Sequence, residues 1–335
     1  MTTYKDIRGT HITTVTADPP APVSGQMWYN STTQVMKGFT SNPTGTWSTT
    51  GSLNQAREAL AAAGQAPKDT GLAFLGFNNP TAYTNTELFN GSSWTELADL
   101  NTGRANAWGF GISTAALAAG GYIGGATAAS QTHVETWNGS SWTETTDIPS
   151  SGYSGGSAGI TTSGLIFAGI STPPFTVLSQ NTKSWNGSAW TELNDLNTAR
   201  NATGGVGATG TAALCSTGNN TTTGTVTATE SWNGSSWTEV NDVNTARQGV
   251  SNAGIYTDAL IAAGGPATPA LFANTELWNG SSWTETSDMN NAVDNADGGG
   301  STSAAISSGG NIPSVTDQAE AWVAPTTSTV TFTAS

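Results

Sequence analysis

Apolar and polar side chains alternate along short stretches of this chain, on both sides of a recurring Asn-Gly-Ser-Ser tetrapeptide, as in residues 86–97. Alternation of this kind is typical of strands with one buried face. Asn-Gly between two such strands is a strong hairpin signal, because both central residues of a tight turn take positive φ. A two-residue turn would place Phe89 opposite Ser92 and Glu87 opposite Trp94, with all four on one face. We therefore predict an outer hairpin in each repeat.

The hairpin unit recurs through most of the chain, and its second Trp returns every 46 to 48 residues. The second Trp of each unit is Trp47, Trp94, Trp142, Trp190, Trp237 and Trp283, and a last Glu-x-Trp ends at Trp322. A polar segment follows most hairpins and ends in an arginine, which is Arg57, Arg104, Arg200 and Arg247. A strand of small residues ending in glycine comes next. A period of about 40–50 residues with short strands and glycine-rich turns predicts a β-propeller.

The order of arginine, paired glycine, Glu-x-aromatic and Trp resembles that of the kelch superfamily over about residues 38–323. The resemblance implies an all-β, six-bladed kelch-type propeller. Trp47 has no Glu-x-Trp before it, and Trp322 has no Asn-Gly-Ser-Ser-Trp after it. We therefore expect the strand at 320–323 to pair with the strand around Trp47, so that the N- and C-terminal strands close the ring and leave no exposed edge.

The repeated Arg and Glu residues have two interpretations. Recurrence at one blade position indicates a structural role, in which charge-assisted hydrogen bonds tie neighbouring blades together. The alternative, which six-bladed lectins exemplify, is a repeated sugar pocket formed by Arg, Glu and Trp at the blade junctions. We favour the structural role, because the tryptophans are needed for the core.

The N-terminal segment, residues 1–37, lies outside the repeat. We expect an arm with a hairpin that turns at Asn30–Thr33, then the propeller at residues 38–323 and a C-terminal tail at 324–335. Residues 25–37 resemble a short module of tailed-bacteriophage virion proteins, and the repeats are similar to kelch-like proteins of environmental phages. The resemblance implies that the arm anchors the chain to a virion through Trp28 and Tyr29. The alternative is a plain hairpin that packs against the propeller.

The composition limits the classes of partner that this chain is expected to bind. Charged residues make up 10% of the 335 residues, the formal net charge is −14, and the few Lys and Arg form no cluster. Such a chain repels phosphate backbones and anionic membranes, so we expect neither nucleic-acid binding nor membrane insertion. The single cysteine, Cys215, is expected to be a small buried residue. Without a signal-like or membrane-spanning stretch, we expect synthesis in a host cytoplasm followed by assembly into the virion.

Catalytic chemistry has few candidates. Only His11 and His133 are present, which is too few for a copper site or an arguable Ser-His-Asp arrangement. We expect no enzyme activity, no metal and no cofactor. Binding is expected instead in the least repetitive loops, which join strands on a rigid scaffold. Their aromatic residues, Tyr122, Phe175 and Phe272, are the candidate contacts.

These observations favour a non-enzymatic bacteriophage virion structural protein, either a tail fibre or appendage or a capsid decoration. It would be oligomeric or multicopy on the particle, contact other virion proteins through the arm, and present the propeller to a host-surface glycan or protein. Two alternatives stay open: a glycan-binding lectin propeller and, less favoured, a carbohydrate-active enzyme.

Overall fold

The computed structural model describes residues 12–42, 44–124, 129–171, 177–266 and 270–332. The chain forms two compact units, a propeller unit of Thr46–Val323 and a terminal unit of Met1–Gly45 with Ala324–Ser335. These bounds correct the sequence-based division at residues 37 and 323. Residues 38–45 belong with the arm, and residues 324–335 are no separate tail, because strand β37 (Thr326–Phe332) pairs with β3 (Val35–Asn42).

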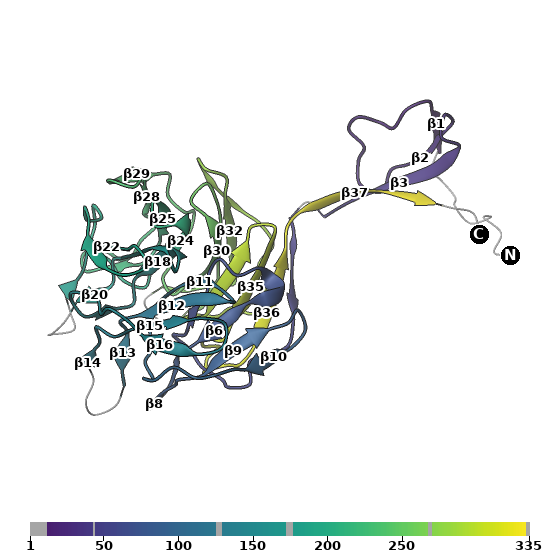
Figure 1. The fold of residues 1–335 in the computed structure, drawn as a ribbon. Coiled ribbons are helices and arrows are strands. Elements are labelled where there is room, and N and C mark those ends of the chain that lie inside the picture. The colour runs from purple at the N-terminus through teal and green to yellow at the C-terminus, as the bar shows by residue number, and fades with distance from the viewer. Residues whose placement is uncertain (1–11, 43, 125–128, 172–176, 267–269, 333–335) are drawn as a thin grey trace. The chain divides into compact units, whose positions relative to one another are not determined.

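The propeller unit contains six antiparallel four-stranded sheets, as predicted, and we number these blades in chain order (Figure 1). Blades 1 to 3 are β5 (Ala61–Ala62), β6 (Leu72–Phe74), β9 (Thr86–Phe89) and β10 (Trp94–Glu96); β11 (Trp108–Ile112), β12 (Ala115–Ala119), β15 (Val134–Trp137) and β16 (Trp142–Glu144); and β18 (Gly156–Ile160), β19 (Ser163–Phe167), β22 (Thr182–Trp185) and β23 (Trp190–Glu192). Blades 4 to 6 are β24 (Gly204–Thr209), β25 (Ala212–Ser216), β28 (Thr229–Trp232) and β29 (Trp237–Val240); β30 (Ser251–Ile255), β31 (Asp258–Ala262), β32 (Thr275–Trp278) and β33 (Trp283–Glu285); and β34 (Asp297–Ser301), β35 (Ala304–Ser308), β36 (Ala319–Val323) and β4 (Thr46–Thr49).

The innermost strand of each blade is the one most constrained to small residues. A Cβ on Gly109 would come within 2.9 Å of the Ala62 carbonyl oxygen in the neighbouring blade. A Cβ on Gly205 would come within 2.5 Å of the Ser157 nitrogen. The small-residue strands that end in glycine, such as β12, are second in their blades. Close backbone approach between neighbouring innermost strands therefore selects glycine there.

The outer hairpins form, but their register corrects the sequence prediction. Phe89 pairs with Trp94, and Glu87 pairs with Glu96, so the loop has four residues instead of two. The Asn90 Oδ1 atom accepts the backbone N–H groups of Ser92 and Ser93 at 3.0 and 2.9 Å. This Asx turn uses the Asn side chain to hold the loop. Positive φ is confined to Gly91, at 93°, so Asn and Gly play different roles.

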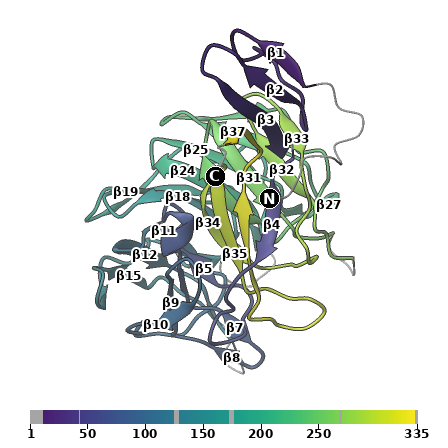
Figure 2. The same ribbon diagram turned by 90° about the vertical axis from the view of Figure 1, so that its right-hand side faces the viewer.

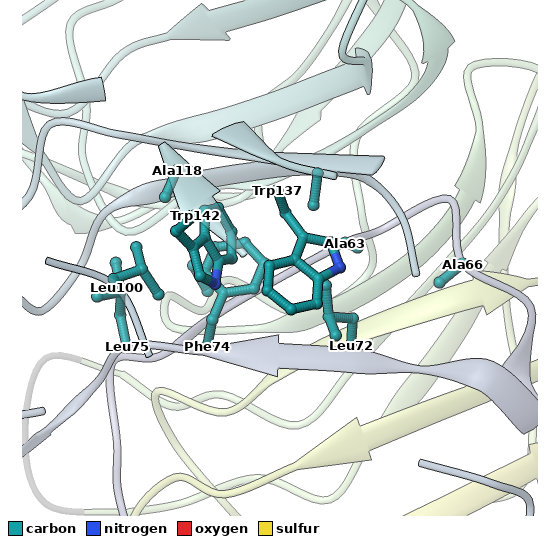
Figure 3. Close-up of a cluster of buried hydrophobic side chains, with 11 residues drawn as sticks. Ala63, Ala66, Leu72, Phe74, Leu75, Leu100, Ala118, Trp137 and Trp142 are labelled. Carbon is teal, nitrogen blue, oxygen red and sulfur yellow. The ribbon is translucent and has the colours of Figure 1, made fainter. Parts of the chain in front are cut away.

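One aromatic pair per blade forms the core of each hairpin. In blade 2 the ring centroids of Trp137 and Trp142 lie 5.5 Å apart, and the five other blades have pairs at 5.1 to 5.5 Å. Trp142 also packs edge-on against Phe74 of blade 1, at 4.9 Å, and its Nε1 donates to the Thr86 hydroxyl at 2.8 Å. Figure 3 shows these rings among Leu72, Leu75 and Leu100. The tryptophans therefore join adjacent blades.

Ring closure occurs as predicted. In blade 6 the outer strand β4 comes from the start of the propeller unit, and β34, β35 and β36 come from its end (Figure 2). Trp322 pairs directly with Trp47, and Glu320 with Thr49. The Trp47 Nε1 donates to the Thr275 hydroxyl of blade 5 at 2.9 Å. The composite blade removes the free edge that an open ring would expose.

The terminal unit is a mixed sheet in the order β1 (Thr13–Val15), β2 (Met27–Asn30), β3 and β37. The β2–β3 hairpin turns near the predicted position, with Asn30 paired to Val35. Asp18 accepts hydrogen bonds from Trp28 Nε1 at 3.0 Å, Asn30 Nδ2 at 2.8 Å and Lys37 Nζ at 2.6 Å. These bonds, the Lys37 bond foremost, lower the pKa of Asp18 to about 2.

The remaining elements are short. Two-residue strands decorate the loops, namely β7 (Phe77–Asn78), β8 (Thr81–Ala82), β13 (Tyr122–Ile123), β14 (Ala129–Ser130), β17 (Gly152–Tyr153), β20 (Ile170–Ser171), β21 (Val177–Leu178), β26 (Asn219–Asn220) and β27 (Gly224–Thr225). A single turn of 3₁₀ helix covers Lys68–Thr70. Within the described ranges, no helix has the length and apolar character needed to cross a bilayer.

Candidate functional site

The repeated charges form buried clamps at the start of four blades. In blade 2, Arg104 Nη1 donates to Glu135 Oε1 at 3.1 Å. The backbone N–H and the Nδ2 of Asn101 both donate to Glu135 Oε2 at 2.8 Å. Both ionised side chains are at most 1% exposed. Burial lowers the pKa of the Arg104 guanidinium, and the facing Glu135 opposes that shift. The same clamp occurs in blades 1, 4 and 5 as Asn54–Arg57–Glu87, Asn197–Arg200–Glu230 and Asn244–Arg247–Glu276.

The clamp joins neighbouring blades in an indirect way. The Arg104 side chain binds Glu135 of its own blade, while its backbone carbonyl accepts the Gly76 N–H of blade 1 at 3.1 Å. The segment that leads from one blade into the next is called the crossover. In every blade an equivalent glycine N–H donates to the backbone carbonyl at the arginine position of the crossover into the following blade. The other five glycines are Gly121, Gly169, Gly218, Gly264 and Gly310. The φ of these six glycines is 84° to 117°, whereas the residue before each has φ of 58° to 66°. Non-glycine residues tolerate the left-handed φ of 58° to 66°, whereas φ of 84° to 117° requires glycine.

That difference explains why the paired glycine of the repeat is incomplete in sequence. The second glycine is present in all six blades, and the first is replaced by Leu75, Ala168, Thr217 and Ala263. The pair in blade 5 is therefore Ala263-Gly264, and the pair in blade 6 is Gly309-Gly310.

Two blades depart from the clamp. In blade 6, Val293 takes the arginine position, and the backbone N–H and Nδ2 of Asn291 supply the missing donors to Glu320 Oε1 at 3.0 and 3.1 Å. In blade 3, Pro149, Gly152 and Lys183 take the positions of Asn, Arg and Glu. Lys183 is 7% exposed, and burial lowers its pKa.

A closed ring of backbone hydrogen bonds surrounds the propeller axis. One residue per blade, in the left-handed region with φ of 51° to 64°, donates its N–H to the carbonyl of its counterpart in the preceding blade at 2.7 to 3.0 Å. The six residues are Ala59, Asn106, Ser154, Ala202, Gly249 and Asn295. The ring fixes the distances between all six blades at once. No single residue type marks it in the sequence, because the position is occupied by Ala, Asn, Ser or Gly.

The ring residues and the innermost strands line a cavity of about 100 Å³. Asp297 is the one acidic side chain among the lining residues. Burial raises the pKa of Asp297 to about 7, although the Gly298 N–H donates to its Oδ1 at 2.7 Å. Nearby, burial raises the pKa of Asp294 to about 6. In the described part of the chain, no group of three or more His, Cys, Asp or Glu side chains is placed to hold a metal ion.

The predicted contact residues have separate positions. Tyr122 lies on the β13–β14 ribbon of blade 2, half-buried, with its ring 5.5 Å from that of Tyr153 in blade 3. Phe272 lies in the blade 5 loop, half-buried, and is held by a backbone bond to Gly264. Phe175 lies outside the described residues. Tyr122 and Phe272 lie in loops of two different blades, blade 2 and blade 5.

The remaining sequence candidates are largely buried. Trp28 has 0% exposure and forms the core of the terminal unit, while Tyr29, next to it, is half-buried. The four clamp arginines are 0% exposed, and each hairpin Trp is at most 7% exposed except Trp190, which is half-buried. These side chains therefore present no repeated aromatic surface to a sugar. Cys215 is buried, as expected, and accepts a bond from Arg200 Nη2 at 3.4 Å.

The fold defines the class of protein: a kelch-type six-bladed β-propeller. The structure is similar to that of YjhT, a kelch-repeat propeller protein, with a TM-score of 0.66 and 12% sequence identity, covering 85% of this chain and 99% of that one. At that identity the likeness concerns the fold alone. No protein-family model matches the sequence, and no curated protein matches it.

Proposed function

We propose that this protein is a non-enzymatic structural component of a bacteriophage particle, a tail appendage or capsid decoration. In this proposal the terminal unit attaches the chain and the propeller contacts a host surface or another virion protein. One observation carries the proposal: both chain ends combine in a small sheet of their own, separate from a propeller that is already closed by its composite blade. A closed propeller does not need this sheet to complete a blade, which leaves the sheet free for attachment.

Strand β37 supports an attachment role. Its one described partner is β3, so it forms an edge of the sheet. Its seven residues contain no charge and no proline, the features that usually protect an edge strand. An edge of this kind presents backbone N–H and C=O groups to a strand from a partner. The expected attachment is therefore strand addition by another virion protein.

The charge distribution supports display over catalysis. In four blades the Arg and Glu side chains are buried and paired with each other, so they hold the crossovers and do not face a ligand. A glycan is the surface ligand that the half-buried Tyr122–Tyr153 pair best suits, because aromatic faces pack against sugar rings. Several copies on one particle would add weak contacts through effective concentration.

The attachment test compares two double variants of the full chain. Thr329 and Thr331 are exposed on β37, so T329K/T331K should fold normally and block strand addition. T95K/T143K places the same charges on exposed threonines of the propeller hairpins and serves as the control. Immunogold electron microscopy of particles from cells that express each variant should show labelling for wild type and control only. Equal labelling of all three would remove β37 from the attachment, and no labelling of wild-type particles would overturn the virion assignment.

A glycan array tests the display surface separately. Wild-type protein should bind a subset of glycans, and Y122A/Y153A should lose that binding while keeping its thermal unfolding midpoint. Binding that survives the double substitution would exclude the tyrosine pair.

A further inference from the structure

Blade 3 contains a small cavity at the position where four other blades hold an arginine. Its lining includes Trp108, Gly152, Phe167, Ser179 and Lys183, and its volume is about 20 Å³. A cavity needs about 10–15 Å³ on this measure to hold one water molecule, so there is room for one water or one monatomic ion. Gly152, which stands at the arginine position, has no side chain to occupy the site.

The replacements in blade 3 reverse the electrostatics of the clamp. In blade 2 the carboxylate of Glu135 receives donors from Asn101 and Arg104. In blade 3, Pro149 has no N–H to donate, Gly152 carries no charge, and Lys183 supplies a cation at the carboxylate position. Blade 2 has three donors around one carboxylate. Blade 3 has one ammonium at the carboxylate position and no acceptor side chain at positions 149 and 152.

Lys183 is the feature that requires a ligand. Its side chain is largely buried and lines the cavity, and among the described residues it makes no hydrogen bond and no ion pair. The acidic groups whose charges act on it are Glu192 and Asp195, both exposed. Burial of most of this side chain disfavours the charged ammonium, and a counter-ion in the cavity offsets that cost.

Ser179 can supply a second contact. Its Oγ accepts the Asn181 backbone N–H at 3.0 Å, which leaves the hydroxyl hydrogen free to turn toward the cavity. Trp108 forms an apolar wall: a Cβ on Gly152 would lie 2.7 Å from its ring. An ammonium, a hydroxyl and an apolar wall around a space for one atom suit a halide better than a polyatomic anion.

We propose that this cavity binds one small monovalent anion of the size of chloride, held by the Lys183 ammonium. Blade 3 thereby replaces the buried carboxylate of the other blades with an exchangeable ion. The site is independent of the proposed virion role, because it concerns the joint between blades 2 and 3.

Bromide identifies the site directly. Crystals of the full chain soaked in sodium bromide should show an anomalous peak within about 3.5 Å of Lys183 Nζ, and crystals of K183M should not. The matched control K68M removes a half-buried lysine that is paired with Asp69, and it should keep the peak. A wild-type map with no peak there, or peaks of equal height beside the other lysines, would overturn the proposal.

A restored clamp gives a second test that does not depend on the stability of K183M. The triple variant P149N/S150N/K183E rebuilds the arrangement of blade 6, in which two neighbouring asparagines donate to Glu320, and it leaves Gly152 unchanged beside the Trp108 ring. In solution the thermal midpoint of wild type should rise steadily with the logarithm of bromide concentration, at ionic strength held constant with gluconate. The triple variant should show no such rise. An equal bromide response in both proteins would mean a general salt effect and would contradict the site.

Discussion

Blades 2 and 3 have the same four strands and the same packed pair of tryptophans, yet they hold their crossovers in opposite ways. In blade 2 a buried carboxylate, Glu135, collects three donors, while in blade 3 a buried ammonium, Lys183, stands alone. Both blades keep the glycine hydrogen bond that joins them to the preceding blade. The comparison shows that backbone geometry is common to all blades, whereas the polar clamp differs between blades.

The largest contrast should come from matched methionine substitutions. E135M leaves Arg104 buried without its counter-ion, and we expect a loss of about 3–5 kcal/mol in the free energy of unfolding. K183M removes an unpaired charge and keeps the aliphatic stem, so its effect should stay within about 1 kcal/mol in either direction. Urea denaturation of both variants in chloride-free buffer measures the difference. Equal losses would mean that the two blades do not differ as described.

Removing both ions from blade 2 should recover much of that loss. The double variant R104M/E135M has no uncompensated charge, and we expect it to be about 2 kcal/mol more stable than E135M. A double-mutant cycle that includes R104M gives the coupling energy. If the two losses simply add, the pair does not act as a unit.

Blade 6 offers an intermediate case, because Asn291 replaces the arginine. N291A leaves the Glu320 Oε1 atom without its side-chain donor, although the backbone N–H remains. We expect a loss of about 1–2 kcal/mol, smaller than that of E135M. Thermal and urea unfolding of N291A beside the control T95A, at an exposed position on strand β10, measures it. A loss as large as that of E135M would contradict the ranking.

The smallest effect concerns Asp297, an acidic residue on the innermost strand of blade 6, β34. Its pKa is raised from 3.8 to about 7, so the folded state holds the proton more tightly than the unfolded state. Stability from this group is therefore full below about pH 4 and is lost as the pH rises to about 7. D297N should be more stable than wild type by about 1 kcal/mol at pH 8 and by little at pH 4. The gain is modest because Asp297 lines the cavity and is only half-buried, so that water weakens its pKa shift. If wild type were more stable than D297N at pH 8, Asp297 would be ionised and stabilised in the cavity.

Much of the architecture follows from the sequence because each repeat carries its own local signals. Strand alternation, Asn-Gly turns and the spacing of tryptophans predicted six blades, and the incomplete first and last repeats predicted closure through Trp47 and Trp322. The hairpin register was wrong because a two-residue and a four-residue loop fit the same apolar spacing. Only the Asn90 side chain, by accepting two backbone N–H groups, decides between them.

The sites were harder to predict. The arginine and glutamate positions were visible, but their burial and their indirect link between blades depend on where the crossover lies. Trp28, which was expected to anchor the chain, lies in the buried core of the terminal unit, where its Nε1 donates to Asp18. The pairing of residues 326–332 with β3 joins segments that are far apart in sequence, and neither segment carries a repeat signal.

The sequence by itself determined the repeat, the number of blades, the hairpins and the closing strand, because these rest on side-chain alternation and turn chemistry within about fifty residues. The tertiary structure alone decided the ring of six backbone hydrogen bonds, the terminal unit made from both chain ends and the cavity beside Lys183. Backbone bonds between blades leave no mark on residue type. A cavity depends on what several distant segments fail to fill.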